Sequence, residues 1–123
     1  MTITLTIGSK SDIGMKRTEN QDSHGHYFPE KGCDHPKGVL IALADGMGGH
    51  AGGSKASSTA VDTLMEEYYK EIQSSIPISM LHAFKHANQA VLDAAESNPD
   101  LKGMGSTLTA VVFHKDILYY GHV

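Results

Sequence analysis

An aspartate, Asp45, stands where an apolar run meets a glycine-rich stretch: residues 39–44 read VLIALA, and GMGG follows the aspartate. The end of a buried strand holds a carboxylate in a fixed direction, and neighbouring glycines let other groups approach closely. A carboxylate beside the Gly46 carbonyl is a hard oxygen site, which suits Mg²⁺ or Mn²⁺ better than Zn²⁺. Position alone is equally consistent with a residue that opens a turn or caps the following helix.

Glycine occupies five of the eight positions 46–53. The stretch lacks the Gly-Lys-Ser/Thr ending of a nucleotide-binding P-loop, so nucleotide binding is poorly supported. A merely flexible connection is also disfavoured, because so many glycines after a buried strand would cost conformational entropy without a structural reason. His50 lies inside this turn and close to Asp45, where a proton donor would be useful.

Two further polar residues, Arg17 and Asp22, lie five positions apart in a polar stretch. A guanidinium group can hold two phosphate oxygens at once. Taken singly, however, an arginine is more often part of a surface ion pair, and an aspartate is more often a turn residue. Arg17 and Asp22 therefore indicate a phosphate site only in combination with the other motifs of the sequence.

His82 and His86 are spaced i, i+4 within a predicted helix, which is a zinc-binding spacing. The glutamate usual between such histidines is absent, and no cysteine or third histidine lies nearby in sequence, so exposed helix histidines are the better interpretation. The single cysteine, Cys33, lies in a polar stretch and is interpreted as an ordinary loop thiol.

The composition excludes several classes of partner. The net charge is −4 and no lysine or arginine cluster is present, which argues against nucleic acid or an anionic membrane as the main partner. With one cysteine no internal disulfide can form, so a reducing, cytoplasmic setting is expected. No apolar run approaches membrane-spanning length, and the amino-terminal residues lack the apolar core of a signal peptide.

Two patterns describe the elements that must position these residues. Alternating threonine and aliphatic residues predict a half-buried strand over residues 2–7, and a weaker strand is expected near 24–28. The apolar run 39–44 predicts a strand buried on both sides. Between the last two strands, residues 29–38 are predicted to form a loop.

After the glycine turn, an apolar stripe of Ala60, Val61, Leu64, Tyr68 and Ile72 predicts a helix that ends near residue 72. A second helix is expected over 78–96, with Leu81, Phe84, Val91 and Ala95 facing inward. Strands at 106–113 and 117–120 follow, joined by a tight turn at 114–116. This order of elements predicts an α+β fold, with a sheet and a helical layer on one face.

Three motifs together resemble those of metal-dependent serine/threonine protein phosphatases of type 2C. The first comprises SDIG at 11–14, Arg17 and NQD at 20–22; the second is DGMGGHAGG at 45–53, in its bacterial form; the third is GMGSTL at 103–108. Their order and separations also agree with the family. The resemblance implies one part of a four-layer α-β-β-α sandwich, with two antiparallel sheets and outer helices.

The resemblance also implies a role for individual residues. Asp45 matches the aspartate that bridges two Mg²⁺ or Mn²⁺ ions, Gly46 matches a glycine whose carbonyl binds one ion, and Asp22 matches a carboxylate that orients metal-bound water. Arg17 matches the arginine that holds the substrate phosphate, and His50 best matches a histidine proposed as general acid. The reaction implied is hydrolysis of phosphoserine and phosphothreonine in proteins by a hydroxide held between the metals.

Two positions depart from the family pattern. Gln21 stands where many relatives have glutamate, so that a ligand there becomes a water contact at best, and Ser54 occupies a position often held by glutamate. The end of the chain, YYGHV, resembles a strand that leads into a Gly-Asp-Ser motif. Residues 1–123 are therefore expected to form the amino-terminal half of a phosphatase domain, inactive alone because the other half carries further metal-binding aspartates.

The expected partner is a phosphorylated protein substrate of a serine/threonine kinase in cytoplasmic signalling, and self-association of residues 1–123 is also expected. Two other functions stay open from the sequence. One is a truncated, non-catalytic phosphatase-like module that binds a partner, and the other is a zinc hydrolase built on the histidines.

Overall fold

The computed structural model describes residues 3–123. In chain order its elements are β1 (Asp22–Tyr27), the 3-10 turn η1 (Gly32–Asp34), β2 (Val39–Met47), α1 (Gly52–Tyr68), α2 (Ile76–Ser97), the 3-10 turn η2 (Pro99–Leu101), β3 (Gly105–Ser106), β4 (Thr109–His114) and β5 (Ile117–His122). Among the described residues, none of the helices combines the length and apolar character needed to cross a membrane.

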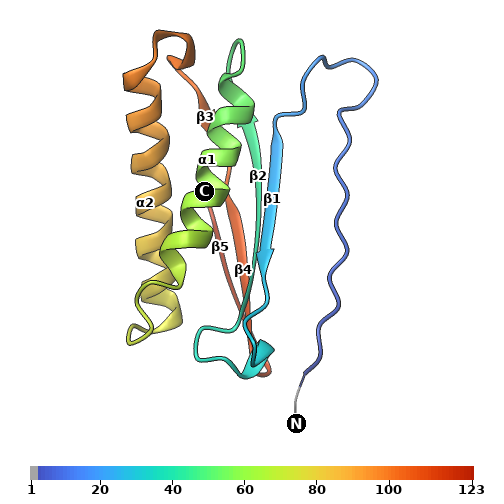
Figure 1. The fold of residues 1–123 in the computed structure, drawn as a ribbon, viewed down its shortest axis with the longest axis vertical. Helices are drawn as coiled ribbons and strands as arrows, with labels where there is room; N and C mark the ends of the chain where they lie inside the picture. The colour runs from blue at the N-terminus through green and yellow to red at the C-terminus, as the bar shows by residue number, and fades with distance from the viewer. Residues whose placement is uncertain (1–2) are drawn as a thin grey trace.

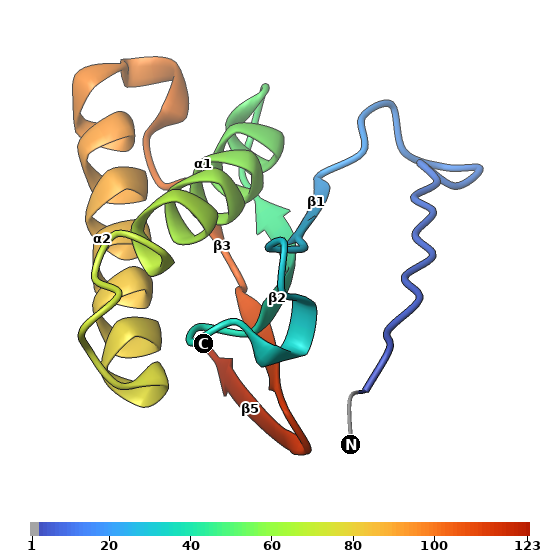
Figure 2. The same cartoon turned by 60° about the horizontal axis from the view of Figure 1, so that its bottom comes forward.

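The strands form one antiparallel sheet in the order β1-β2-β4-β5, and the short β3 pairs with the far end of β2. Helices α1 and α2 lie together on one face of this sheet (Figures 1 and 2). The predicted α+β class and the helical layer on one face are thus confirmed.

The core lies between the helices and the sheet. On β2, Leu40, Ala42 and Ala44 point toward the helices and are buried, as the two-residue period of a strand requires. Helix α1 meets them with Leu64 and Tyr68, both about 1% exposed. Burying one leucine of this kind contributes about 2 kcal/mol, so this layer accounts for much of the stability of the unit.

The opposite face of the sheet carries apolar side chains that no helix covers. Leu43 on β2 is 56% exposed, and Leu118 and Tyr120 on β5 are 52% and 74% exposed. The second sheet implied by the family resemblance is not formed by residues 3–123. The described residues therefore form one sheet with one helical layer, which is one half of a four-layer sandwich.

The predicted strand at residues 2–7 is wrong for the residues that the structure describes, and Thr2 lies outside them. Residues 3–7 are extended, with Ile3, Leu5 and Ile7 half-buried, but they are not assigned to a strand. They run on the side of the sheet away from the helices (Figures 1 and 2). Alternation predicts one-sided burial, whereas a strand also needs a hydrogen-bonded neighbour, and no described strand pairs with this segment.

Several predicted boundaries shift. Strand β2 continues three residues beyond Ala44 because β1 and β3 pair with its end. Helix α1 ends at Tyr68, before Ile72, and α2 begins at Ile76, where the Ser75 side chain accepts a hydrogen bond from the Ile78 amide. Leu81 is 49% exposed, so its predicted inward orientation is wrong.

The predicted strand at 106–113 is divided into β3 and β4. Between them, the Thr107 amide bonds to the Asp45 carbonyl, and the Asp45 amide bonds to the Thr107 hydroxyl. The other parts of the prediction agree well. Strand β1 covers the weaker strand expected near 24–28, and α2 stops before Asn98-Pro99.

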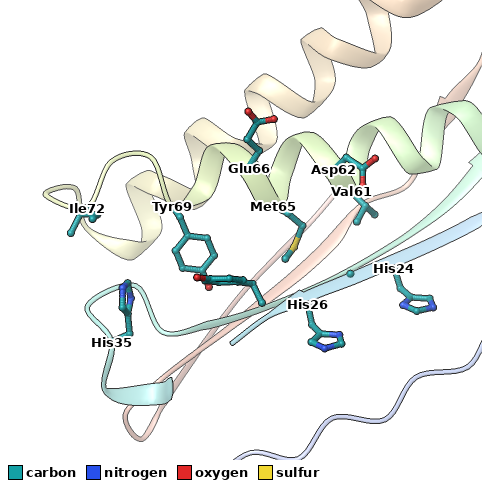
Figure 3. A pocket seen from close by; sticks show the side chains of 11 residues that line it. His24, His26, His35, Val61, Asp62, Met65, Glu66, Tyr69 and Ile72 are labelled. Carbon is teal, nitrogen blue, oxygen red and sulfur yellow. The ribbon is translucent and has the colours of Figure 1, made fainter. Parts of the chain in front are cut away.

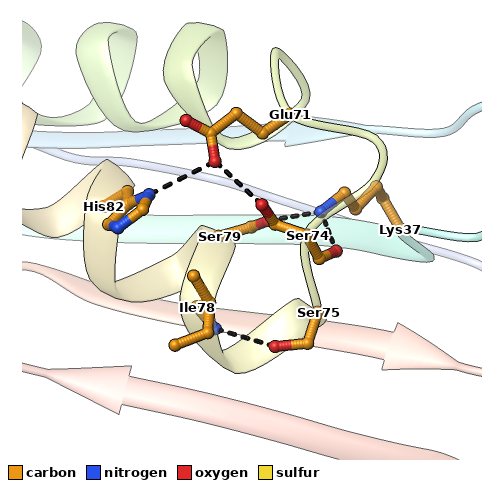
Figure 4. Close-up of polar contacts among 7 residues, drawn as sticks. All are labelled: Lys37, Glu71, Ser74, Ser75, Ile78, Ser79 and His82. Carbon is orange, nitrogen blue, oxygen red and sulfur yellow. Dashed lines mark hydrogen bonds and ion pairs between the residues drawn. The ribbon is translucent and has the colours of Figure 1, made fainter.

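A buried lysine, Lys37, joins the connection between β1 and β2 to the connection between the two helices (Figure 4). The Lys37 amine donates hydrogen bonds to the Ser74 carbonyl and the Ser79 hydroxyl, while the Tyr68 hydroxyl donates to the Lys37 carbonyl at 2.7 Å. Burial lowers the pKa of Lys37, and the charge of Glu71 partly opposes this shift. The network fixes the β1–β2 connection against the connection between the helices.

Candidate metal and phosphate site

A hollow of about 580 Å³ lies at the end of the sheet where β1 begins and β2 finishes. Four of the five residues singled out in the sequence line it: Arg17, Asp22, Asp45 and Gly46. They come from three separate segments, namely the stretch before β1, the first residue of β1 and the end of β2. The structure thus brings together residues that the sequence could connect only through the motif resemblance.

Asp22 and Asp45 are direct partners in the β1–β2 ladder. Directly opposed residues of an antiparallel pair point to the same face, here the face away from the helices, because the adjacent Ala44 points toward them. Two ionised carboxylates that face each other in this way destabilise the strand pair by roughly 0.2–1 kcal/mol. A cation between them would remove that repulsion, so the pair is suited to holding one.

Gly46 and Gly53 are required for close approach rather than for flexibility. A Cβ atom on Gly46 would lie 1.9 Å from the Gly53 carbonyl oxygen, and one on Gly53 would lie 2.4 Å from Cδ of Gln21. The end of β2 therefore packs against the backbone of Gly53 and of Gln21, and the Gln21 side chain packs on Gly53. These contacts account for the glycines at positions 46 and 53.

Arg17 reaches the hollow from the segment before β1, and this segment is held by its own hydrogen bonds. The Asp12 carboxylate accepts from the Gly14 amide at 2.7 Å, and the Asn20 side chain donates to the Ser11 hydroxyl at 2.7 Å. The Asn20 side chain also accepts from the Asp22 amide at 3.0 Å. The first motif thus forms one connected polar unit that presents Arg17 beside Asp22.

His50 is placed differently from the other candidates. It lies in the exposed turn between β2 and α1, with a left-handed backbone (φ 52°), and is not among the residues that line the hollow. The sequence correctly placed it in the glycine turn, but nearness along the chain to Asp45 did not bring it into the same hollow.

Residues 15–123 match the family model described as protein phosphatase 2C. The chain belongs to the protein phosphatase 2C family. A protein of Streptococcus pyogenes described as protein phosphatase 2C-type is 37% identical, and the match covers 97% of this chain and 47% of that protein. The serine/threonine protein phosphatase PstP of Mycobacterium tuberculosis is 34% identical over the whole of this chain, which covers 22% of PstP.

Solved structures agree with this assignment. The crystal structure of Mycobacterium tuberculosis PstP superposes with a TM-score of 0.75 at 36% identity, covering 93% of this chain and 44% of that one. The PstP catalytic domain in complex with two manganese ions gives a TM-score of 0.74, covering 93% of this chain and 45% of that one. The chain thus spans less than half the length of these phosphatase 2C relatives.

The oxygen donors in the hollow fit the divalent ions that this phosphatase family uses. Asp22, Asp45 and the Gly46 carbonyl are hard ligands of the kind Mg²⁺ and Mn²⁺ prefer. Among residues 3–123, no group of three or more His, Cys, Asp or Glu side chains could hold a metal ion. Of the four acidic residues that line the hollow, Asp12, Glu19, Asp22 and Asp45, only Asp22 and Asp45 are directly opposed in the sheet. A pair of carboxylates is only a partial ligand set for a divalent ion.

The zinc-hydrolase alternative has no such donor set in the described part of the chain. His82 Nδ1 lies 3.3 Å from a Glu71 carboxylate oxygen on the exposed side of the helices, which is an ordinary surface contact. Cys33 lies in the loop between β1 and β2, as expected, and is 2% exposed, so it is a buried packing residue.

A second hollow, of about 650 Å³, lies between β1 and α1 (Figure 3). Met65 of α1 and Tyr69, which follows the last residue of α1, point toward the strand, and the Tyr27 and Tyr69 rings meet edge to face with centroids 4.9 Å apart. Burial raises the pKa of the Tyr69 hydroxyl, which donates a hydrogen bond to the Gly38 carbonyl. The aromatic side chains beside this hollow pack α1 against the edge strand β1.

Sequence reasoning missed Glu19, which lines the hollow, and the contact by which Thr107 holds the backbone of Asp45. Thr107 belongs to the third motif, so that motif was the available signal. Glu19 carries no signal in the sequence, because its role depends on a contact with Ser54, which is 35 positions away.

Proposed function

We propose that this chain contributes to a metal-dependent phosphatase that removes phosphate from phosphoserine and phosphothreonine in proteins. The observation that carries the proposal is the pair of directly opposed carboxylates, Asp22 and Asp45, in one hollow with Arg17. Negative groups that attract cations, beside a guanidinium that attracts phosphate, are the two parts that phosphoryl transfer to water requires.

Each residue has a distinct role. Asp22, Asp45 and the Gly46 carbonyl would hold the divalent ions. When bound, Mg²⁺ or Mn²⁺ supplies Lewis acidity, which lowers the pKa of water and provides a nucleophile at neutral pH. Asp22 also orients that water, and Arg17 holds two phosphate oxygens in its planar fork and offsets charge in the transition state.

His50 is proposed as the donor of the proton to the leaving serine or threonine oxygen. Its position in the turn next to Asp45 and Gly46 supports this role, and its exposure leaves it free to meet a substrate. Because His50 does not line the hollow, it would act through a water molecule or after the turn closes over a bound phosphoprotein.

Residues 1–123 are proposed as the amino-terminal half of a phosphatase domain, with the remaining metal-binding carboxylates supplied by the other half. The partial ligand set and the uncovered apolar face of the sheet both support this division. Alone, residues 1–123 would lack turnover and would associate through that face.

We also propose that the protein acts in cytoplasmic signalling, with a substrate of a serine/threonine kinase as its partner.

The non-catalytic alternative shares this fold, so only chemistry distinguishes the two. The test is hydrolysis of a small aryl phosphate by the complete domain, with Mg²⁺ or Mn²⁺ and in excess chelator. Metal-dependent turnover is expected because the donors in the hollow are all oxygen. Full activity in chelator, activity with Zn²⁺ alone, or no activity with any metal would each overturn the proposal.

A further inference from the structure

Gln21 contacts the glycine turn at two points. Its side-chain Nε2 donates a hydrogen bond to the Gly48 carbonyl at 3.2 Å, and its backbone carbonyl accepts one from the Gly46 amide at 2.9 Å. Gln21 immediately precedes Asp22, and Gly46 immediately follows Asp45. The backbone bond therefore joins the two segments that carry the opposed carboxylates.

A third contact fixes the direction of the Gln21 amide. A Cβ on Gly53 would lie 2.4 Å from Cδ and 2.5 Å from Nε2 of Gln21, so the amide lies flat on the first turn of α1. The Gln21 side chain is thereby held between the glycine turn and the first turn of α1. The amide nitrogen of Gln21 thus has a direct protein partner, the Gly48 carbonyl.

The chemistry of this position favours an amide. The Gly48 carbonyl oxygen accepts a hydrogen bond, and the Gln21 amide can donate one, whereas an ionised carboxylate could only bring a second acceptor. The amide of Gln21 thus matches the acceptor that the side chain meets.

A neighbouring contact anchors the same segment to the same helix. The Ser54 hydroxyl donates to a Glu19 carboxylate oxygen at 2.5 Å, and Ser54 lies in the first turn of α1 beside Gly53. Gln21 and Ser54 thus both join the segment before β1 to the start of α1.

We propose that Gln21 is a positioning residue, which sets the spacing of Asp22 and Asp45 by holding the glycine turn against α1. The hydrogen bond between Ser54 and Glu19 holds the same two segments together at a second point. This inference rests on the proposed metal site. Groups that orient metal ligands through hydrogen bonds typically change metal affinity by about tenfold or more when removed. Gln21 should therefore affect metal affinity more than overall stability.

The experiment compares Gln21→Met with wild type in the complete domain. Methionine keeps the length and approximate volume of the side chain but cannot donate to Gly48. Gln89→Met on the exposed face of α2 is the matched control, because it makes the same chemical change far from the hollow. Mn²⁺ affinity is measured by titration calorimetry, melting temperature in chelator, and hydrogen exchange of the glycine-turn amides without metal.

The expected result for Gln21→Met is about tenfold weaker Mn²⁺ binding, faster exchange at Gly46, and turnover that recovers at saturating Mn²⁺. A lower melting temperature with unchanged Mn²⁺ affinity would show a purely structural role and overturn the proposal. Unchanged affinity and exchange would also overturn it, while wild-type turnover would leave the phosphatase function standing. A wild type that binds no Mn²⁺ would overturn both.

Discussion

Thr107 brackets the backbone of Asp45: the Asp45 amide donates to the Thr107 hydroxyl at 2.9 Å, and the Thr107 amide donates to the Asp45 carbonyl at 2.9 Å. The third motif thus holds the second across 62 positions of sequence. Thr107 contributes no ligand to the hollow. Its role is to fix the strand end from which the Asp45 carboxylate projects.

Thr107→Val should therefore lower the free energy of unfolding by about 1 kcal/mol, because the Asp45 amide loses its acceptor. Turnover of the complete domain at limiting Mn²⁺ should fall as well. Denaturant unfolding and a Mn²⁺ titration of the rate provide the measurements. Thr63→Val on α1 is the control. Equal effects of the two substitutions would contradict a specific role for the hydrogen bonds between Thr107 and Asp45.

Asp45→Asn should abolish turnover in the complete domain while the fold persists, because a neutral amide cannot bridge two cations. Without metal, the variant should be as stable as wild type or more stable by roughly 0.2–1 kcal/mol, since the repulsion from Asp22 is removed. With Mn²⁺ present, only wild type should gain melting temperature. Near-normal turnover with an unchanged circular dichroism spectrum would show that Asp45 is only a structural residue.

Arg17→Ala should raise KM for a phosphopeptide and also lower kcat, because the guanidinium contacts charge that grows in the transition state. Lysine at this position should restore only part of the loss, since a point charge cannot hold two oxygens in a planar fork. Steady-state kinetics with saturating Mn²⁺ measure both constants. A change in KM alone would limit Arg17 to ground-state binding.

His50→Ala should lower kcat more for a phosphoserine peptide than for an aryl phosphate. A phenolate leaves readily without a proton, whereas a serine alkoxide does not. The ratio of the two losses is the quantity to measure, because any general damage to the turn reduces both rates alike. Equal losses on the two substrates would remove His50 from the proton-donor role.

Gly53→Ala should destabilise the complete domain by about 1–3 kcal/mol, because the added methyl group would overlap the Gln21 amide. Gly49→Ala is the matched control: its Cβ would meet nothing within 4 Å, so it should change stability by less than about 0.5 kcal/mol. Thermal or denaturant unfolding compares the two. Similar small effects would mean that the glycines serve flexibility after all.

Residues 1–123 alone should show no phosphatase turnover with Mn²⁺, and their mass in solution should exceed that of a monomer. The exposed Leu118 and Tyr120 on edge strand β5 provide the apolar surface for association. Leu118→Lys should reduce the mass toward that of the monomer. A well-folded wild-type monomer with the turnover of the complete domain would contradict both the partial ligand set and the uncovered face.

The local sequence determined the elements and the chemical character of the site. The six apolar residues before Asp45 specify a strand by themselves, but its predicted burial on both sides is wrong, because Leu43 lies on the face that no helix covers and is 56% exposed. The glycine turn after them marks a strand end that can present a carboxylate. The spacing of Ala60, Val61 and Leu64 specifies the buried side of α1, because helical periodicity is a property of neighbouring residues. The three motifs in order identified the family, and with it the metal class.

Only the tertiary structure decided which of these residues meet. The opposition of Asp22 and Asp45 depends on the register of β1 against β2, which packing sets over a distance along the chain that no local pattern spans. The same packing turned Gln21 toward Gly48, left His50 outside the hollow and left Leu81 exposed. Periodicity gives each element its faces, but the choice of which face is covered belongs to the elements that pack against it.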